Sequence, residues 1–260
     1  MLEGLHFANA LDLLSRIDDG GVDLIVTDPP YGVRYHSNYH KGGNPHDTVA
    51  GDDRKVVPRV LREFARVLKP GGAAYIFTRW DVYPDWTPHL PGLKVKNLLV
   101  WVKNNHSAGD LKGDYGRKYE LILFAVKGRH LLRGQRPINV LEFPRIDHTK
   151  VLHPVQKPVE LVEFLMEKSS DAGDLVFDPF VGTGTTVQAA MNLERRFLAC
   201  DVDPAMCVTA RDRLGVPLVG ELPVEVPDVL DPIDNVEHPR GLDPDECREL
   251  TRLLKERDAL

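Results

Sequence analysis

The chain has 260 residues, of which 42% are hydrophobic and 28% charged, and its formal net charge at pH 7 is −6. This composition predicts a soluble globular protein with one ordinary core. An acidic, amphipathic amino terminus and the absence of any run of roughly 18 apolar residues exclude a signal peptide and a membrane span from our expectations. The three cysteines, Cys200, Cys207 and Cys247, lack paired metal-ligand spacing, which argues against a disulfide framework or a zinc site and for a cytoplasmic protein.

Short β-branched and aromatic runs alternate with segments of helical period along residues 1–215. This alternation predicts an α/β domain with a mostly parallel sheet and crossover helices. Strands are expected at 22–27, 73–78, 98–102, 120–126, 174–177 and 196–201, and helices at 8–17, 55–68, 158–170, 185–193 and 204–214.

The first motif is "VDLIVTDPPYG", in which an apolar strand runs into Asp28, Pro29, Pro30 and Tyr31. Proline has a fixed φ and also restricts the residue before it, so these four residues form a rigid turn. A carboxylate and a proline carbonyl that accept the two N–H bonds of an aromatic amine would localise its lone pair and aim it at an electrophile. Tyr31 would stack on the ring that carries the amine. The alternative is a strand-ending turn with a packed tyrosine.

The second motif, "DLVFDPFVGTGTTVQAA", is a strand that ends in Asp178 and continues through Gly182 and Gly184 into a helix. Glycines at such a turn let a ligand approach the backbone, and the free N–H groups of the helix start attract an anionic group. Asp201 closes the next strand, where an acid can take both ribose hydroxyls. S-adenosylmethionine fits better than a dinucleotide, because Val187 replaces the third glycine of the dinucleotide pattern and amides near Thr185 can hold the methionine carboxylate.

The two motifs both lie at the carboxyl ends of predicted parallel strands, the edge at which ligands of open α/β sheets collect. If the two strands are neighbours, the turn at Asp28 faces the sulfonium methyl group. This adjacency is the main geometric expectation of the sequence.

These segments resemble the permuted beta group of amino-group DNA methyltransferases, which make N6-methyladenine or N4-methylcytosine. "TDPPYG" is similar to the catalytic motif, "FDPFVGTGTT" to the cofactor motif and "FLACDVDP" to the strand with the ribose acid, while "HPVQKPVELVEFLMEKSS" is similar to the segment before the cofactor motif. The resemblance implies a Rossmann-like sheet of about seven strands with helices on both faces, S-adenosylmethionine as methyl donor, and double-stranded DNA as the substrate from which a base is flipped.

The resemblance also assigns roles to single residues. It implies that Asp28, Pro29, Pro30 and Tyr31 are catalytic. It implies that the cofactor is held by Asp178, Phe180, Gly182, Gly184, Thr185 and Asp201, with Gln156 and Lys157 beside its methionine end. No metal site is expected, because His36, His40 and His46 have no carboxylate at ligand spacing.

Charge is unevenly distributed along the chain. Residues 94–157 hold 13 basic and 5 acidic residues, which predicts a DNA-facing surface, although a solvated basic face is the alternative. The loops at 32–54 and 128–150 are expected to read the target. The tail, 216–260, holds 12 acidic and 5 basic residues, so we expect it to limit non-specific DNA binding. A capped helix near its end has a leucine stripe that suits docking or a homodimer.

The leading hypothesis is therefore a site-specific adenine-N6 DNA methyltransferase of a restriction-modification system, since aspartate in the first motif position resembles adenine-directed members. An N4-cytosine DNA methyltransferase is the alternative within the family. An NAD-dependent oxidoreductase and a non-catalytic DNA-binding protein with a methyltransferase fold are the alternatives from other classes.

Overall fold

The computed structural model describes residues 2–31, 56–106, 112–113, 115–146 and 156–222. Its strands are β1 (Gly4–Phe7), β2 (Val22–Thr27), β3 (Leu68–Thr78), β4 (Lys94–Val102), β5 (Tyr119–Val126), β6 (Val140–Glu142), β7 (Leu175–Asp178), β8 (Arg196–Asp201) and β9 (Leu218–Val219). Its helices are α1 (Ala10–Leu14), α2 (Val56–Val67), α3 (Tyr83–Trp86), α4 (Val159–Ser169), α5 (Thr185–Asn192) and α6 (Pro204–Leu214), with a short 3-10 turn, η1 (Thr87–His89).

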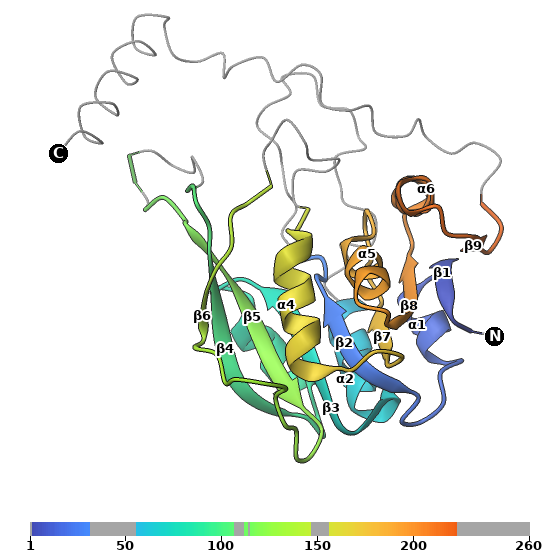
Figure 1. Cartoon of the computed structure of the whole chain (residues 1–260), viewed down its shortest axis with the longest axis horizontal. Helices are drawn as coiled ribbons and strands as arrows, with labels where there is room; N and C mark the ends of the chain where they lie inside the picture. Colours follow the sequence, from blue (N-terminus) through green and yellow to red (C-terminus); the bar gives the residue numbers. More distant parts are fainter. Residues whose placement is uncertain (1, 32–55, 107–111, 114, 147–155, 223–260) are drawn as a thin grey trace, which may run out of the picture.

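All nine described strands form one sheet in the order β6-β4-β5-β3-β2-β7-β8-β1-β9 (Figure 1). Only β5 runs against its neighbours β3 and β4, and the other paired strands are parallel. Seven strands make up the body of the sheet, and the very short β6 and β9 extend its two edges. The predicted α/β fold with a mostly parallel sheet is confirmed.

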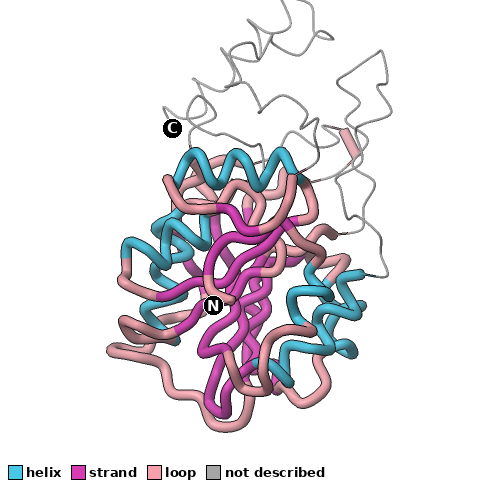
Figure 2. Tube along the Cα trace, turned by 90° about the vertical axis from the view of Figure 1, so that its right-hand side faces the viewer, coloured by secondary structure: helices cyan, strands magenta, loops and turns pink. Residues whose placement is uncertain are grey.

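Helices cover both faces of the sheet, as Figure 2 shows. Side chains alternate across the strands, so Ile25 of β2 joins the core beneath α1 and α2, while its neighbours Leu24 and Val26 join the core beneath α4 and α5. Phe64 of α2 and Leu165 of α4 are almost completely buried in these two cores. The near-continuous apolar sequence of β2 follows from this burial on both faces.

The observed elements agree with most predicted ones and differ where the sequence signal is short. Strand β3 begins at Leu68, directly after α2, because Leu68 pairs with Val22 while the following Lys-Pro-Gly-Gly stretch stays extended. Strands β1, β6 and β9 have four, three and two residues, too few to show alternation, and were not predicted. Helix α3 has four residues, too few to show a helical period, and was also missed.

Described structure continues past residue 215, at which the catalytic domain was expected to end. Strand β9 pairs with β1 through Leu218 and Val219, and Val216 is buried against Leu5 and neighbouring side chains. The prediction missed this because two residues of edge strand carry no periodic pattern. The remainder of the acidic tail, 223–260, lies outside the described residues.

Membrane spans and disulfide bonds were both unexpected from the composition. Among the residues that the structure describes, no helix is both long and apolar enough to span a membrane. Cys200 and Cys207 are buried free thiols, whereas Cys247 lies outside the described residues.

Two truncations test the domain end. Removing 216–260 should lower the free energy of unfolding by about 2 kcal/mol more than removing 223–260, because the longer cut also removes buried Val216 and β9. Urea denaturation followed by circular dichroism measures both values. Equal unfolding free energies for the two truncated proteins would contradict this domain end. The shorter cut also tests the charge hypothesis, which expects tighter binding to a non-specific DNA duplex at low salt.

Candidate active site at the carboxyl edge of the sheet

Asp28 lies at the carboxyl edge of the sheet, one residue beyond the end of β2. Its side chain is one-quarter exposed, and Pro29 behind it is buried. The hydroxyl of Tyr31 donates a 2.7 Å hydrogen bond to Oδ1 of Asp28. The Tyr31 ring lies 5.9 Å from the ring of Trp86, tilted by 46°. The four residues predicted to be catalytic thus form a compact turn whose polar groups face one another.

Burial raises the pKa of Tyr31 well above its usual value, and the negative charges of Asp28 and Glu120 raise it further. Tyr31 therefore stays protonated at neutral pH and acts as a hydrogen-bond donor to Asp28. Its neutral ring remains suited to stacking on another aromatic surface.

Lys157 is buried directly beside Asp28. Its Nζ lies 2.6 Å from Oδ2 of Asp28 and 3.1 Å from Oε2 of Glu120, and only 8% of its side chain is exposed. The same ammonium lies 5.3 Å from the centre of the Phe77 ring. The resemblance placed Lys157 beside the methionine end of the cofactor, and the structure shows that it is paired with the catalytic turn.

Glu120 and Lys103 complete this cluster, and neither was predicted. Glu120 stands at the second position of β5 and accepts a 2.5 Å hydrogen bond on Oε1 from Lys103, which follows β4. The signal available in the sequence is one acid and one base at the catalytic ends of two apolar strands. This signal predicts an ion pair only when β4 and β5 are known to be antiparallel neighbours, since that pairing brings the end of β4 beside the start of β5.

The cofactor motif is joined to β2 through Asp178. Oδ1 of this buried carboxylate accepts a 2.7 Å hydrogen bond from the hydroxyl of Thr27 and a 3.0 Å bond from the backbone N–H of Phe180. Burial raises the pKa of Asp178 to about 6, although hydrogen bonds from Thr186 and Thr27 act in the opposite direction. Asp178 therefore fixes the turn after β7 and ties it to the strand that carries Asp28.

The two glycines of this turn have different tasks. Gly182 has φ of +50°, and a Cβ built on it would meet no atom within 4 Å, so its surface is open to a ligand. Gly184 has φ of +88° and is the N-cap of α5, and a Cβ there would lie 2.7 Å from a methyl group of Leu214 and 3.1 Å from Ala210 on α6. The backbone is thus uncovered at Gly182, whereas Gly184 allows α6 to pack closely.

Asp201 at the end of β8 holds the glycine turn in place. Its Oδ2 accepts a 2.9 Å hydrogen bond from the N–H of Gly182, and its Oδ1 accepts one of 2.9 Å from the N–H of Asp203. Burial raises the pKa of Asp201 to about 6, although these backbone donors lower it. The carboxylate thus borders the open surface above Gly182.

The two predicted motifs meet because β2 and β7 are neighbours. Leu24 pairs with Val176 and Ile25 with Phe177 in parallel register, so the turns after the two strands leave the same edge of the sheet side by side. The main geometric expectation of the sequence is confirmed. Gln156 precedes Lys157 at the entrance to α4 and is partly buried.

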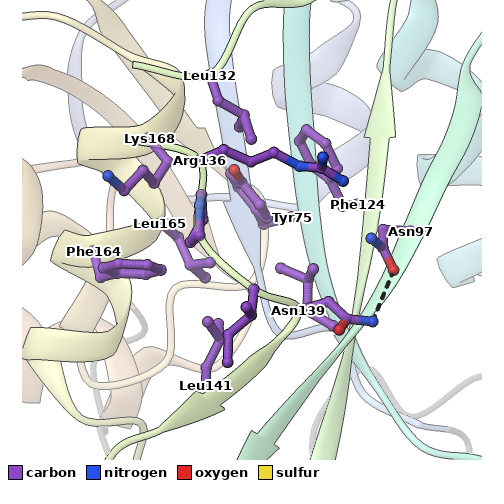
Figure 3. Close-up of a pocket in the computed structure, with 13 residues that line it drawn as sticks. Tyr75, Asn97, Phe124, Leu132, Arg136, Asn139, Leu141, Phe164, Leu165 and Lys168 are labelled. Carbon is purple, nitrogen blue, oxygen red and sulfur yellow. Dashed lines mark hydrogen bonds between the residues drawn. The ribbon is translucent and has the colours of Figure 1, made fainter. Parts of the chain in front are cut away.

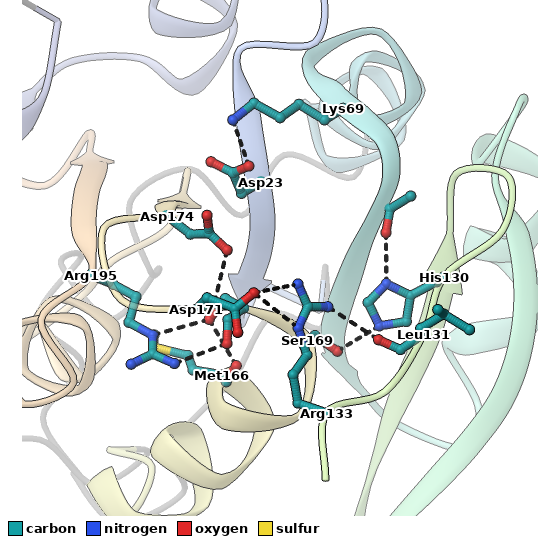
Figure 4. Close-up of polar contacts among 12 residues, drawn as sticks. Asp23, Lys69, His130, Leu131, Arg133, Met166, Ser169, Asp171, Asp174 and Arg195 are labelled. Carbon is teal, nitrogen blue, oxygen red and sulfur yellow. Dashed lines mark hydrogen bonds and ion pairs between the residues drawn. The ribbon is translucent and has the colours of Figure 1, made fainter.

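Of the two loops expected to read the target, the structure describes only part of 128–150, and most of that part lies away from the catalytic edge. Residues 32–54, with the three histidines, lie outside the described residues, and the described part of the chain contains no cluster of three metal-ligating side chains. The segment after β5 begins at the opposite edge of the sheet, because β5 is antiparallel. There His130 hydrogen-bonds Gly71 and Ser169, and Arg133 pairs with Asp171 (Figure 4). Only after β6 does the chain return to the catalytic edge, where the N–H of Arg145 bonds Asn104.

The basic segment 94–157 is likewise divided between the two edges. Lys94 begins β4 and Lys127 follows β5, so both lie at the edge away from Asp28, and Lys127 donates to the carbonyl of Leu68. Lys103 and Lys157 are committed to the buried cluster. The described bases that the topology brings to the catalytic edge on the connection between β4 and β5 are Lys112, Arg117 and Lys118.

A separate cavity of about 600 Å³ lies between α4, the middle of the sheet and the segment that leads into β6 (Figure 3). Tyr75, Phe124 and Phe164 form much of its wall, and Arg136 and Lys168 supply positive charge. None of the residues that the resemblance makes catalytic or cofactor-binding lines it. The cavity is therefore distinct from the site at the carboxyl edge.

Comparison with known proteins now adds to this geometry. The DNA methylase family, of the N6 and N4 methyltransferase type, matches residues 22–212. The chain belongs to this family. It is therefore a DNA methyltransferase of the type that acts on an exocyclic amino group, and this membership argues against the oxidoreductase and non-catalytic alternatives.

Individual relatives agree with the family. The chain is 28% identical to the type II methyltransferase M.HpaI of Haemophilus parainfluenzae over 82% of its own length and 74% of the relative. It is 28% identical to the DNA adenine methyltransferase YhdJ of Escherichia coli over 80% and 81% of the two chains. The crystal structure of M1.HpyAVI superposes with a TM-score of 0.61 at 25% identity, covering 81% of this chain and 98% of the other.

A Thr27→Val substitution tests the link between the two motifs. It keeps the side-chain shape but removes the donor to buried Asp178, and should lower the free energy of unfolding by about 1–3 kcal/mol. Urea denaturation provides the measurement. The matched control is Thr209→Val on α6, whose hydroxyl bonds only a helix carbonyl and whose loss should matter less. Equal effects of the two substitutions would contradict a special role for the Thr27 hydroxyl.

Proposed function

We propose that this chain is a site-specific methyltransferase that transfers the methyl group of S-adenosylmethionine to the N6 amine of adenine in double-stranded DNA after base flipping. The observation that carries the proposal is the adjacency of β2 and β7, reinforced by the Thr27–Asp178 hydrogen bond. This adjacency puts the carboxylate that would hold the amine beside the turn that would hold the methyl donor. Bound at that turn, S-adenosylmethionine would supply an electrophilic methyl group to the amine that Asp28 would hold.

The catalytic turn would act by positioning the amine. Oδ1 of Asp28 and the carbonyl of Pro29 or Pro30 accept its two N–H bonds, which concentrates the lone pair on nitrogen. Tyr31 supplies a neutral ring on which the flipped base stacks. Lys157 pairs with Oδ2 of Asp28 at 2.6 Å and so holds the carboxylate in a fixed orientation.

The residues of the second motif fit S-adenosylmethionine. When bound, this cofactor supplies an electrophilic methyl group on a sulfonium. The open surface above Gly182 leaves room for the nucleoside, and Asp201 borders it with carboxylate oxygens for the ribose hydroxyls. Helix α5 has no side-chain cap, so the N–H groups near Thr185 are available to the methionine carboxylate. Phe180 would contact the cofactor from the same turn, and Gln156 would approach its methionine end.

Adenine is preferred over cytosine for two reasons. Aspartate at position 28 resembles adenine-directed members of the family, and the relative YhdJ is named as a DNA adenine methyltransferase. Relatives such as M.HpaI are type II methyltransferases, which supports a place in a restriction-modification system in the cytoplasm. The proposed DNA-facing surface comprises the catalytic edge and the bases between β4 and β5. A homodimer stays a prediction, because the leucine stripe lies outside the described residues.

An Asp28→Ala variant tests the proposed chemistry. Loss of the carboxylate that orients the amine should lower kcat by about 10²–10³-fold, measured with radiolabelled S-adenosylmethionine and duplex DNA. Asp19→Ala, which removes an exposed carboxylate paired with Arg66, is the control and should keep wild-type kcat. Nucleoside analysis of the wild-type product should show N6-methyladenine. Wild-type kcat in Asp28→Ala would overturn the catalytic assignment, and N4-methylcytosine as the only product would overturn the choice of base.

The pKa of Asp201 predicts how cofactor binding depends on pH. Burial raises this pKa to about 6, and the ionised form is the better acceptor for ribose hydroxyls, so affinity should be full above pH 6 and fall as pH drops through it. The Kd for S-adenosylmethionine should rise about tenfold between pH 7 and pH 5. Isothermal titration calorimetry measures Kd without turnover. An Asp201→Asn variant should bind weakly with a flatter pH dependence, and an unchanged pH dependence would remove Asp201 from the ribose site.

A further inference from the structure

The catalytic edge holds a row of four buried or half-buried charges, and two of them, Lys103 and Glu120, have no role assigned by the family motifs. Lys103 contacts Glu120, Glu120 contacts Lys157, and Lys157 contacts Asp28, at N···O distances of 2.5, 3.1 and 2.6 Å. The four side chains come from the ends of β4, β5 and β2 and from the segment before α4. Two positive and two negative charges alternate along the row, so the cluster is neutral as a whole.

We propose that Glu120 is a positioning residue for methyl transfer: anchored by Lys103, it fixes the Lys157 ammonium against Oδ2 of Asp28, which directs Oδ1 toward the amine of the target base. This inference rests on the proposed function, in which Asp28 holds that amine. Glu120 itself does not touch the substrate.

The environment of Lys157 shows why a second carboxylate is needed. Its ammonium is almost completely removed from water and packs 5.3 Å from the centre of the Phe77 ring. A buried ammonium keeps a defined place only when charged partners replace its hydration. Asp28 is one partner, but it is one-quarter exposed at the end of a turn. Glu120 belongs to strand β5 itself and is hydrogen-bonded by Lys103, so it supplies the fixed reference point.

The anchoring of Glu120 is directional. Its Oε1 is hydrogen-bonded by Lys103, whose ammonium also lies 5.0 Å from the centre of the Trp101 ring. Its Oε2 is buried and has no hydrogen-bond partner of good geometry in the described part of the chain, so the 3.1 Å contact with Lys157 is an ion pair held by charge. The carboxylate therefore points one oxygen at each lysine and cannot rotate freely.

The consequence for Asp28 is an unequal division of its oxygens. Lys157 occupies Oδ2, whereas Oδ1 is bonded, among the residues that the structure describes, by the hydroxyl of Tyr31. A carboxylate oxygen has two lone-pair sites, so Oδ1 has room for one more N–H donor. Without Glu120 the ammonium could slide along the carboxylate and compete for that place.

The pKa values of the cluster give the proposal a specific signature. Burial raises the pKa of Glu120, but Lys157 and Lys103 outweigh burial and hold it at about 2. Burial lowers the pKa of Lys157, but the charges of Asp28 and Glu120 outweigh burial and raise it above its usual value. The charged or titratable groups that face this ammonium in the described residues are Asp28, Glu120 and the neutral Tyr31. Replacing Glu120 with glutamine removes one of the two stabilising charges, so the pKa of Lys157 falls and the lysine loses its proton at a lower pH.

A Glu120→Gln variant is the test, assayed as a full-length enzyme with S-adenosylmethionine and duplex DNA from pH 6 to about pH 10. We expect kcat at neutral pH to fall about tenfold and the KM for DNA to stay within about threefold. The pKa of Lys157 in the wild type lies above this pH range, so wild-type activity should persist to about pH 10, whereas the variant should lose activity toward the alkaline end of the range. The matched control is Asp23→Asn. This substitution changes a carboxylate that pairs with Lys69 at the same 2.5 Å distance, at the opposite edge of the sheet, and should leave kcat and the pH profile unchanged.

Three results would separate the hypotheses. If Asp28→Ala is inactive while Glu120→Gln matches the wild type in kcat and in pH profile, the positioning role is wrong and the proposed function stands. If Asp28→Ala remains active, the proposed catalytic role of Asp28 is wrong, and the positioning role of Glu120 that rests on it is wrong as well. If Glu120→Gln does not fold by circular dichroism, Lys103→Met decides. It keeps both Glu120 and Lys157, and it should lower kcat about threefold without moving the alkaline loss of activity to lower pH. Wild-type kcat in Lys103→Met would then overturn the inference.

Discussion

The site depends on one buried hydrogen bond between two parallel strands. The hydroxyl of Thr27 on β2 donates to Asp178 on β7, and the two residues are 151 positions apart in the sequence. Because each strand leads directly into one of the two motifs, this bond sets the distance between the catalytic turn and the cofactor turn. A carboxylate that is buried and accepts a hydrogen bond from a neighbouring strand tolerates little displacement, since a lost partner leaves a polar group without water or donor.

Burial raises the pKa of the carboxyl groups in the site, whereas hydrogen bonds and lysine partners lower it. Which effect is larger differs from one residue to the next. In Asp178 and Asp201 burial prevails and raises the pKa of each carboxyl to about 6. In Glu120 the two lysines prevail and hold the pKa at about 2. The site thus combines two acids that titrate near neutrality with one that stays ionised. This separation suits the proposed division of labour, in which one region binds a neutral sugar and the other organises charges around an amine.

The site residues that could be predicted are those that lie in short sequence motifs at the ends of recognisable strands. Asp28 to Tyr31 and Gly182 to Asp201 sit at the ends of strands that alternation reveals, and the rule that ligands collect at the carboxyl edge predicted that they would meet. Glu120 and Lys103 could not be found this way, because their meaning depends on the direction of β5. The same reversal places residues 128–139, the first part of the loop expected at 128–150, at the edge of the sheet away from Asp28. Lys157 was recognised as a site residue, but its partner depended on contacts between distant segments.

The order of motifs in the chain also has a consequence for synthesis. Strand β2 lies in the middle of the finished sheet, yet its partner β7 is made about 150 residues later. At ribosomal rates of about 5–20 residues per second, the edge of β2 that β7 will cover waits roughly 8–30 s for its partner. An apolar strand with an unpaired edge is a template for association with other chains. Because the catalytic motif precedes the cofactor motif, the nascent chain exposes the unpaired edge of β2 and can associate with other chains until β7 has been synthesised.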